Sequence, residues 1–211
     1  LLGLGSTSGE TMKIYLANEK AKDIVQHTQQ RLKTELSYDT GEELAKEAIR
    51  KKHNLLIDVF ETFIEPIRTY DEQLQYERQG LIAVMLNREV RKGFREFLTY
   101  YANQDTSIGI HSDAFNKKEF NTMKDHWSFG ENVKHYFGKE YLRYETDELH
   151  FPVALKNFTK MINKQKASIE DTLVIGDGWS DLRPALQEEV DILLIPPFTT
   201  SPDFDYRNLL S

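Results

Sequence analysis

Four short apolar runs divide the chain, and each ends at a polar or chain-breaking residue. They cover residues 54–58, 107–112, 172–175 and 191–195. The first ends in Asp58, the second near Ser112, and the third stops at Gly176-Asp177-Gly178. Continuous apolar runs of this length predict strands that are buried on both faces, as in a parallel sheet.

Between these runs, apolar residues recur at helical spacing. The segments with this spacing are 87–101, with Asn87 as its cap, a region that starts at Asp113, 153–164 and 182–186. Residues 141–144 favour one further short strand. Alternating strands and helices predict an α/β fold, a Rossmann-like three-layer sandwich with a mostly parallel sheet and helices on both faces.

The part before residue 54 is expected to form a separate N-terminal extension. Residues 13–16 predict a strand, Asn18 a cap and residues 21–32 a helix, and residues 40–43 match a capping box that opens a helix through Arg50. Residues 1–11 are rich in small side chains and are interpreted as a cloning-derived or processed leader. The expected organisation is therefore a leader at 1–11, an extension at 12–53 and a core at 54–211.

Composition narrows the classes of function. The 211 residues include 39% hydrophobic and 29% charged residues, as expected for one ordinary globular domain. The net charge of −7 argues against general nucleic-acid binding. No apolar run is long enough to cross a membrane, so a cytoplasmic location is the default expectation. Because cysteine is absent, a bound metal would need oxygen or histidine ligands.

Polar residues at the strand ends carry the candidate chemistry. Asp58, Ser112 and Asp177 each follow a predicted strand, and Asp181 lies four residues after Asp177. Since parallel strands gather their carboxyl ends at one edge of the sheet, these groups are expected to converge there. Converging carboxylates repel one another unless a cation joins them, and oxygen ligands suit Mg²⁺. The helix that follows Gly178 would offer its positive end to an anion such as phosphate.

Three segments resemble motifs of the haloacid dehalogenase-like (HAD) hydrolase superfamily. Residues 57–63 (IDVFETF) resemble the first motif, residues 108–112 (IGIHS) the second, and residues 173–182 (LVIGDGWSDL) the last acidic motif. Their order and spacing agree with that superfamily. The resemblance implies a hydrolase, with phosphatase chemistry as the leading expectation.

The resemblance also implies roles for individual residues. Asp58 would be the nucleophile that forms an aspartyl intermediate, and Ser112 would orient the phosphoryl group. Asp58, the backbone carbonyl of Phe60 and Asp177 would hold Mg²⁺, supported by Asp181. The remaining predicted substrate contacts are Thr62, Gly178 and Trp179.

Two departures from the superfamily pattern leave alternatives open. Phe60 stands where phosphatases carry an acid/base Asp, and Phe cannot transfer a proton. The lysine that should neutralise the nucleophile is assigned to Lys156, 177 − 156 = 21 residues before Asp177, with Lys160 as the other choice. A catalytically weak or inactive binding or scaffolding protein and a dehalogenase-type hydrolase therefore remain alternatives. The binding protein would be favoured if Lys156 lay far from Asp58.

Less specific interpretations compete at each position. The strand-end aspartates and Ser112 are also typical helix caps or turn formers, Lys156 would ordinarily be a solvated helix lysine, and Trp179 could pack against the sheet edge. Residues 64–86 leave room only for a small cap, which favours an open site. The substrate is expected to be a phosphorylated small molecule or macromolecule.

Overall fold

A seven-stranded parallel sheet forms the centre of the protein. The computed structural model describes residues 12–113, 117–126, 130 and 132–211. The strand order is β2-β1-β9-β8-β3-β4-β5, and every neighbouring pair is parallel. The predicted parallel α/β architecture is confirmed. The strands are β1 (Ile14–Leu16), β2 (Asp39–Thr40), β3 (Asn54–Asp58), β4 (Ser107–Ser112), β5 (Val133–Phe137), β8 (Thr172–Gly176) and β9 (Asp191–Leu194).

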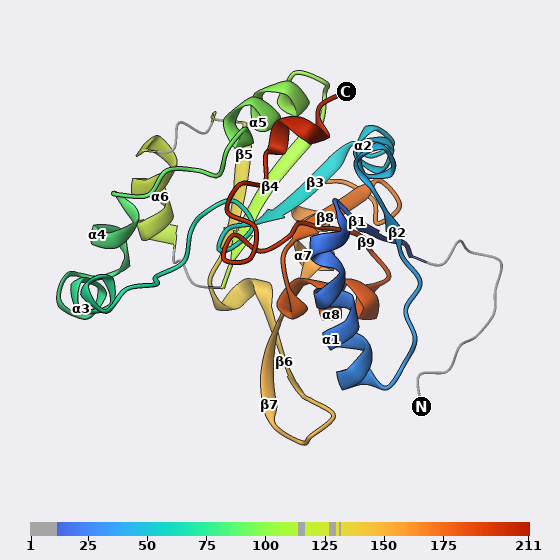
Figure 1. Ribbon diagram of the computed structural model, residues 1–211, viewed down its shortest axis with the longest axis horizontal. Coiled ribbons are helices and arrows are strands. Elements are labelled where there is room, and N and C mark those ends of the chain that lie inside the picture. The colour runs from blue at the N-terminus through green and yellow to red at the C-terminus, as the bar shows by residue number, and fades with distance from the viewer. Residues whose placement is uncertain (1–11, 114–116, 127–129, 131) are drawn as a thin grey trace.

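Helices cover both faces of this sheet, as Figure 1 shows. Successive residues of β3 separate onto two cores: Leu55 and Ile57 join one, and Leu56 joins the other. Alternate burial of this kind explains why the strands are apolar at nearly every position. The helices are α1 (Lys22–Leu32), α2 (Glu42–Arg50), α3 (Tyr70–Gln79), α4 (Leu81–Met85), α5 (Phe94–Ala102), α6 (Lys117–His126), α7 (Phe158–Lys164) and α8 (Trp179–Glu188), with the 3-10 turns η1 (Glu19–Ala21), η2 (Lys139–Tyr141) and η3 (Tyr206–Leu209).

Residues 12–53 complete one edge of the same sheet. Strand β1 pairs with β9, and β2 pairs with β1. The backbone N–H of Lys13 donates to Asp191 at 2.7 Å, and Lys52 forms an ion pair with the same carboxylate at 3.0 Å. Asn18 caps the 3-10 turn η1, as predicted. The extension therefore packs as part of the main domain.

Two predicted helix caps are wrong, although the predicted helix that ends at Arg50 is confirmed. Helix α5 begins after Gly93, which has a positive φ of 77°, and Asn87 lies in the turn after α4. Helix α2 begins after Gly41 without a side-chain cap, because Thr40 is the last residue of β2. In both places the chain turns at a glycine, which tolerates backbone angles that other residues avoid.

The helix predicted for residues 153–164 is also wrong in its first half. Strand β7 (Pro152–Lys156) pairs antiparallel with β6 (Leu142–Thr146), and α7 begins only after Asn157, whose side chain accepts a hydrogen bond from the N–H of Lys160. Short apolar runs fit both helix and strand periods, so the pairing partner decides. The strand predicted at 141–144 lies within this hairpin, shifted by one residue at its start. The hairpin projects from the body of the protein (Figure 1).

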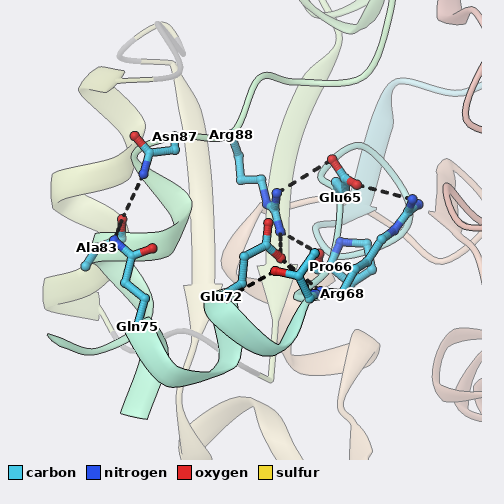
Figure 2. Close-up of polar contacts among 9 residues, drawn as sticks. Glu65, Pro66, Arg68, Glu72, Gln75, Ala83, Asn87 and Arg88 are labelled. Atoms are coloured by element: carbon cyan, nitrogen blue, oxygen red, sulfur yellow. Dashed lines mark hydrogen bonds and ion pairs between the residues drawn. The ribbon is translucent and has the colours of Figure 1, made fainter. Parts of the chain in front are cut away.

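A small helical insert, residues 65–88, follows the loop after β3. It holds α3 and α4, and α3 has no buried residue. Thr69 and Glu72 form a capping box at the start of α3. Figure 2 shows Arg88, in the segment that leaves the insert. It donates to the carbonyl of Pro66, in the segment that enters the insert, and pairs with Glu72 of α3, both at 2.7 Å. The two chain crossings of the insert are thereby joined.

Some predictions lie outside the described residues, including the leader at 1–11 and the chain directly after Asp113. Within the described part of the chain, no helix has the length and apolar character needed to cross a membrane.

Candidate functional site

Three charged side chains from separate segments meet at the carboxyl edge of the sheet. Asp58 is the last residue of β3, Lys156 the last of β7, and Asp181 lies in the first turn of α8. The ammonium Nζ of Lys156 lies 2.8 Å from Asp58 Oδ1 and 2.6 Å from Asp181 Oδ1. All three residues are buried, at 6%, 3% and 0% exposure. The cation predicted from the sequence is therefore in contact with the predicted nucleophile.

Asp177 joins this cluster through Thr62. The Thr62 hydroxyl lies 2.8 Å from Asp177 Oδ1 and 3.4 Å from Asp58 Oδ2, and the N–H of Asp177 donates to Asp181 Oδ2 at 3.3 Å. Gly176 is required for this arrangement, because a Cβ there would lie 2.3 Å from Asp181 Oδ2. Gly178, by contrast, has an extended backbone that any residue can adopt.

The charges within the cluster set its ionisation. Burial by itself opposes the charged form of Lys156, but Asp181 and Asp58 outweigh it and raise the pKa of Lys156 above its usual value. Burial likewise opposes ionisation of Asp58, but the charge of Lys156 lowers the pKa of that carboxyl. Both groups are consequently charged near neutral pH.

Asp177 and Asp181 behave differently from Asp58. Burial, followed by the charge of Asp58, raises the pKa of Asp181 to about 7, although Lys156 opposes this shift. Burial and the neighbouring carboxylates Asp58 and Asp181 raise the pKa of Asp177 well above its usual value. Full ionisation of the three carboxyl groups would therefore bring more negative charge than Lys156 alone neutralises.

His111 is a member of the cluster that was not predicted as a site residue. It pairs in register with Asp58 across β3 and β4, and its Nδ1 lies 3.9 Å from Asp58 Oδ1. Burial, then the charge of Lys156, lowers the pKa of His111 to about 3, so the imidazole is neutral near pH 7. Its ring nitrogens have no well-formed hydrogen bond among the described residues. The register of adjacent parallel strands is the signal that would have found it.

The geometry distinguishes two places for a cation. Ligand atoms of Asp58, His111 and Asp181 lie within 4.8 Å of one another, but the Lys156 ammonium already contacts two of them. Asp58 Oδ2 and Asp177 Oδ1, in contrast, share a single Thr62 hydroxyl, which can donate to only one of them at a time. This pair of hard oxygens fits Mg²⁺.

The other predicted site residues lie around this centre. Ser112 is the last residue of β4, the strand beside β3, and is buried. Phe60 is half-buried in the loop after Asp58. Trp179 opens α8, and its ring faces the guanidinium groups of Arg31 at 4.3 Å and Arg183 at 5.0 Å. The indole is thus packed against protein cations.

Comparison with known proteins gives structural similarities only. No protein-family model and no curated protein sequence matches the chain. Similar solved structures include a protein named as a haloacid dehalogenase-like hydrolase from Bacteroides fragilis, with 19% identity, a TM-score of 0.46 and 92% of each chain covered. A phosphoserine phosphatase in its apo form has 16% identity and a TM-score of 0.44, with 76% of this chain and 98% of that chain covered.

A protein named as a β-phosphoglucomutase from Thermotoga maritima has 11% identity and a TM-score of 0.45, with 71% of this chain and 97% of that chain covered. The first of these three carries the name of the superfamily that the sequence motifs resemble. Similarity at this level assigns neither an activity nor a substrate to this chain.

Proposed function

We propose that this chain is a HAD-like hydrolase that removes a phosphoryl group through an aspartyl intermediate on Asp58. The observation that carries the proposal is the Lys156 ammonium between Asp58 and Asp181, at 2.8 and 2.6 Å. A buried lysine with two carboxylate partners is costly to desolvate, and functional sites are where such arrangements concentrate. The short distance from Lys156 to Asp58 also disfavours the non-catalytic alternative.

In this proposal the residues of the chain divide the work. Asp58, kept ionised by Lys156, attacks phosphorus while the bond to the leaving oxygen breaks and the leaving group departs with the electron pair. Ser112 at the end of the neighbouring strand orients a phosphoryl oxygen. Water then attacks phosphorus of the aspartyl phosphate: the bond from phosphorus to the Asp58 oxygen breaks, its electron pair returns to the Asp58 carboxylate, and both water protons leave on the released dihydrogen phosphate. Lys156 offsets the negative charge of the phosphoryl group beside Asp58 in the first step and that of the Asp58 carboxylate that the second step restores.

Mg²⁺ is the proposed cofactor. Asp58 and Asp177 would hold it, with the carbonyl of Phe60, and it would neutralise phosphoryl charge during transfer. Asp181 was predicted as a further ligand, but its Oδ1 accepts from Lys156 and its Oδ2 from the Asp177 amide. We therefore assign Asp181 to orienting Lys156 and the acidic loop.

Phe60 restricts the chemistry that the site can perform efficiently. Without an acid at this position, the leaving oxygen departs unprotonated, so aryl phosphates and acyl phosphates are the expected substrates and alkyl phosphates are poor ones. The nearby Glu61 does not replace the missing acid, because its carboxylate accepts hydrogen bonds from the amide and hydroxyl of Thr199. Phe60 is also the observation that keeps a binding protein or a dehalogenase-type hydrolase as alternatives.

The proposed core, residues 54–211, surrounds this site, residues 12–53 complete one edge of its sheet, and residues 64–86 form a small cap. A phosphorylated small molecule and a phosphorylated macromolecule both suit a site with so little covering structure.

The test is phosphate release from a panel of aryl, acyl and alkyl phosphates, measured with Mg²⁺ and with a chelator. The variant Asp58→Asn keeps the size of the side chain but removes the nucleophile, and the matched control Asp105→Asn changes an exposed aspartate whose positive φ suits asparagine. We expect metal-dependent turnover that Asp58→Asn abolishes and Asp105→Asn preserves. Turnover that survives Asp58→Asn would reject the aspartyl mechanism. Absence of turnover on every substrate, with Mg²⁺ still bound, would favour the binding protein.

A further inference from the structure

A second buried cation, Arg91, lies outside the charged cluster. It follows the returning crossing of the helical insert and is only 1% exposed. Among the described residues no carboxylate lies within ion-pair distance of it, unlike Lys156. A buried guanidinium without a carboxylate partner needs other acceptors to offset its desolvation. Its contacts therefore indicate its role.

The acceptors are backbone carbonyls of two segments. Arg91 Nη1 donates to the carbonyls of Glu61 and Thr62 at 3.2 and 3.3 Å, and Nη2 donates to the carbonyl of Ser201 at 2.5 Å. The rings of Phe198 and Phe204 lie 5.5 and 5.0 Å from its guanidinium carbon. Arg91 thus joins the loop after Asp58 to the C-terminal segment.

Tyr206 reinforces the same loop from the C-terminal segment. Its buried hydroxyl donates to the Thr62 carbonyl at 2.6 Å, the carbonyl that Arg91 also contacts. The side chain of Thr62 carries the hydroxyl that donates to Asp177 Oδ1. Two donors therefore fix the backbone of the residue that links the two acidic motifs.

The loop needs this support because its backbone is strained. Glu61 has a positive φ of 64°, an uncommon conformation for a residue with a side chain. The carbonyls of Glu61 and Thr62 accept from donors outside the loop: both accept from Arg91, and the Glu61 carbonyl also accepts from the N–H of Phe198, in the C-terminal segment, at 2.9 Å. Unusual backbone of this kind persists where surrounding contacts over-determine it.

We propose that Arg91 and Tyr206 are positioning residues. They hold the backbone carbonyls of Glu61 and Thr62 so that the Thr62 hydroxyl keeps its hydrogen bond to Asp177. The consequence for the site rests on the proposed metal-dependent function. The C-terminal segment, residues 198–209, then determines how well the two acidic motifs are aligned for a cation, although it supplies no ligand itself.

Two matched pairs of variants test this proposal. Arg91→Lys keeps the charge but cannot reach three carbonyls in fork geometry, and Arg88→Lys is its control on the same crossing. Tyr206→Phe removes the hydroxyl bonded to Thr62, and Tyr136→Phe removes a hydroxyl of another buried tyrosine, bonded to Gln165 Oε1 outside the C-terminal segment. The tyrosine pair keeps the test decisive should Arg91→Lys fail to fold.

Two readouts are measured on each variant, neither of which is activity. The first is amide hydrogen exchange of residues 61–64, compared with that of β3. The second is the affinity for Mn²⁺, a paramagnetic substitute for Mg²⁺, from electron paramagnetic resonance of the free ion. We expect Arg91→Lys and Tyr206→Phe to speed loop exchange and to weaken Mn²⁺ binding by about tenfold, as losses of outer contacts to a metal site do. The two control variants should change neither quantity.

Unchanged loop exchange in Arg91→Lys and Tyr206→Phe, or equal effects in the controls, would overturn the proposal. Faster loop exchange with unchanged Mn²⁺ affinity would also overturn it, because the contacts would then be structural only. If the parent protein binds no Mn²⁺, the metal-dependent function fails, while the exchange comparison still decides whether Arg91 and Tyr206 hold the loop.

Discussion

Lys156 and Arg88 each lie between two carboxylates, and their two arrangements differ chiefly in burial. At the sheet edge, Lys156 contacts Asp58 and Asp181, and all three side chains are less than a tenth exposed. In the helical insert, Arg88 contacts Glu72 at 2.7 Å and Glu65 at 3.7 Å, with those carboxylates 25% and 31% exposed (Figure 2).

Burial decides what each arrangement can do. Water can replace either partner of Arg88, so its ion pairs join two chain crossings at small energetic consequence. Water cannot easily replace the partners of Lys156, so the removal of any one group leaves a buried charge uncompensated. The same charge pattern therefore links two chain segments in the helical insert, and at the sheet edge it forms a candidate reaction site.

The largest expected effect is on the buried arrangement. Lys156→Met should lower the free energy of unfolding by about 3–5 kcal/mol and abolish phosphate release, because Asp58 and Asp181 lose their shared cation. Urea unfolding and the phosphate assay measure both quantities. Lys160→Met is the control, since Lys160 donates to the carbonyl of Glu140 and lies over the Tyr141 ring, with no ion pair to a carboxylate among the described residues. Equal losses in the two variants would remove the distinction between the regions.

A substitution at Phe60 tests whether the site around Lys156 lacks only a proton donor for the leaving oxygen. Phe60→Asp should increase turnover of alkyl phosphates by about a hundredfold, which corresponds to about 2.7 kcal/mol in the barrier, because the leaving oxygen is then protonated. Steady-state kinetics on one alkyl and one aryl phosphate measure the gain. Phe60→Asn controls for polarity and size, and an equal gain in that variant would contradict the explanation.

Mg²⁺ should stabilise the buried region specifically. At a concentration ten times its dissociation constant, Mg²⁺ should add about 1.4 kcal/mol to the free energy of unfolding, and the chelator should remove this gain. Asp177→Asn should lose the gain, whereas Asp105→Asn should retain it. Thermal unfolding with and without Mg²⁺ measures the effect, and a gain that persists in Asp177→Asn would place the cation elsewhere.

The smallest effect is expected in the exposed arrangement, and it depends on pH. The hydrogen bond from Arg88 lowers the pKa of Glu72 to about 2. A lowered carboxyl pKa contributes stability above the unfolded pKa of about 4.3, and this contribution is lost as the pH falls toward 2. Glu72→Gln should therefore cost less than about 1 kcal/mol at pH 6, given the partial exposure of Glu72, and less still at pH 3.

Urea unfolding at the two pH values measures this difference, with Glu77→Gln as a control on the same helix. A cost that grows as the pH falls would contradict the assigned ion pair.

The elements that could be predicted share one property. Strands β3, β4, β8 and β9 are apolar at nearly every position, because both faces of the sheet are covered, and the polar residues after them mark their ends. Strand β7 escaped prediction because Val153 and Leu155 fit a helix as well as a strand. The start of α5 was misplaced because Asn87 is a typical cap, whereas the tertiary turn is made at Gly93.

The sequence by itself determined the fold class, the strand ends that carry Asp58, Ser112 and Asp177, and the need for a cation near those carboxylates. Burial periodicity and charge balance are local properties, so they can be read from neighbouring residues. Only the tertiary structure decided that Lys156 ends a strand between Asp58 and Asp181, that His111 faces the same carboxylate, and that Arg91 holds the loop of Thr62. Those contacts join segments tens of residues apart, and their partners are set by strand pairing and packing.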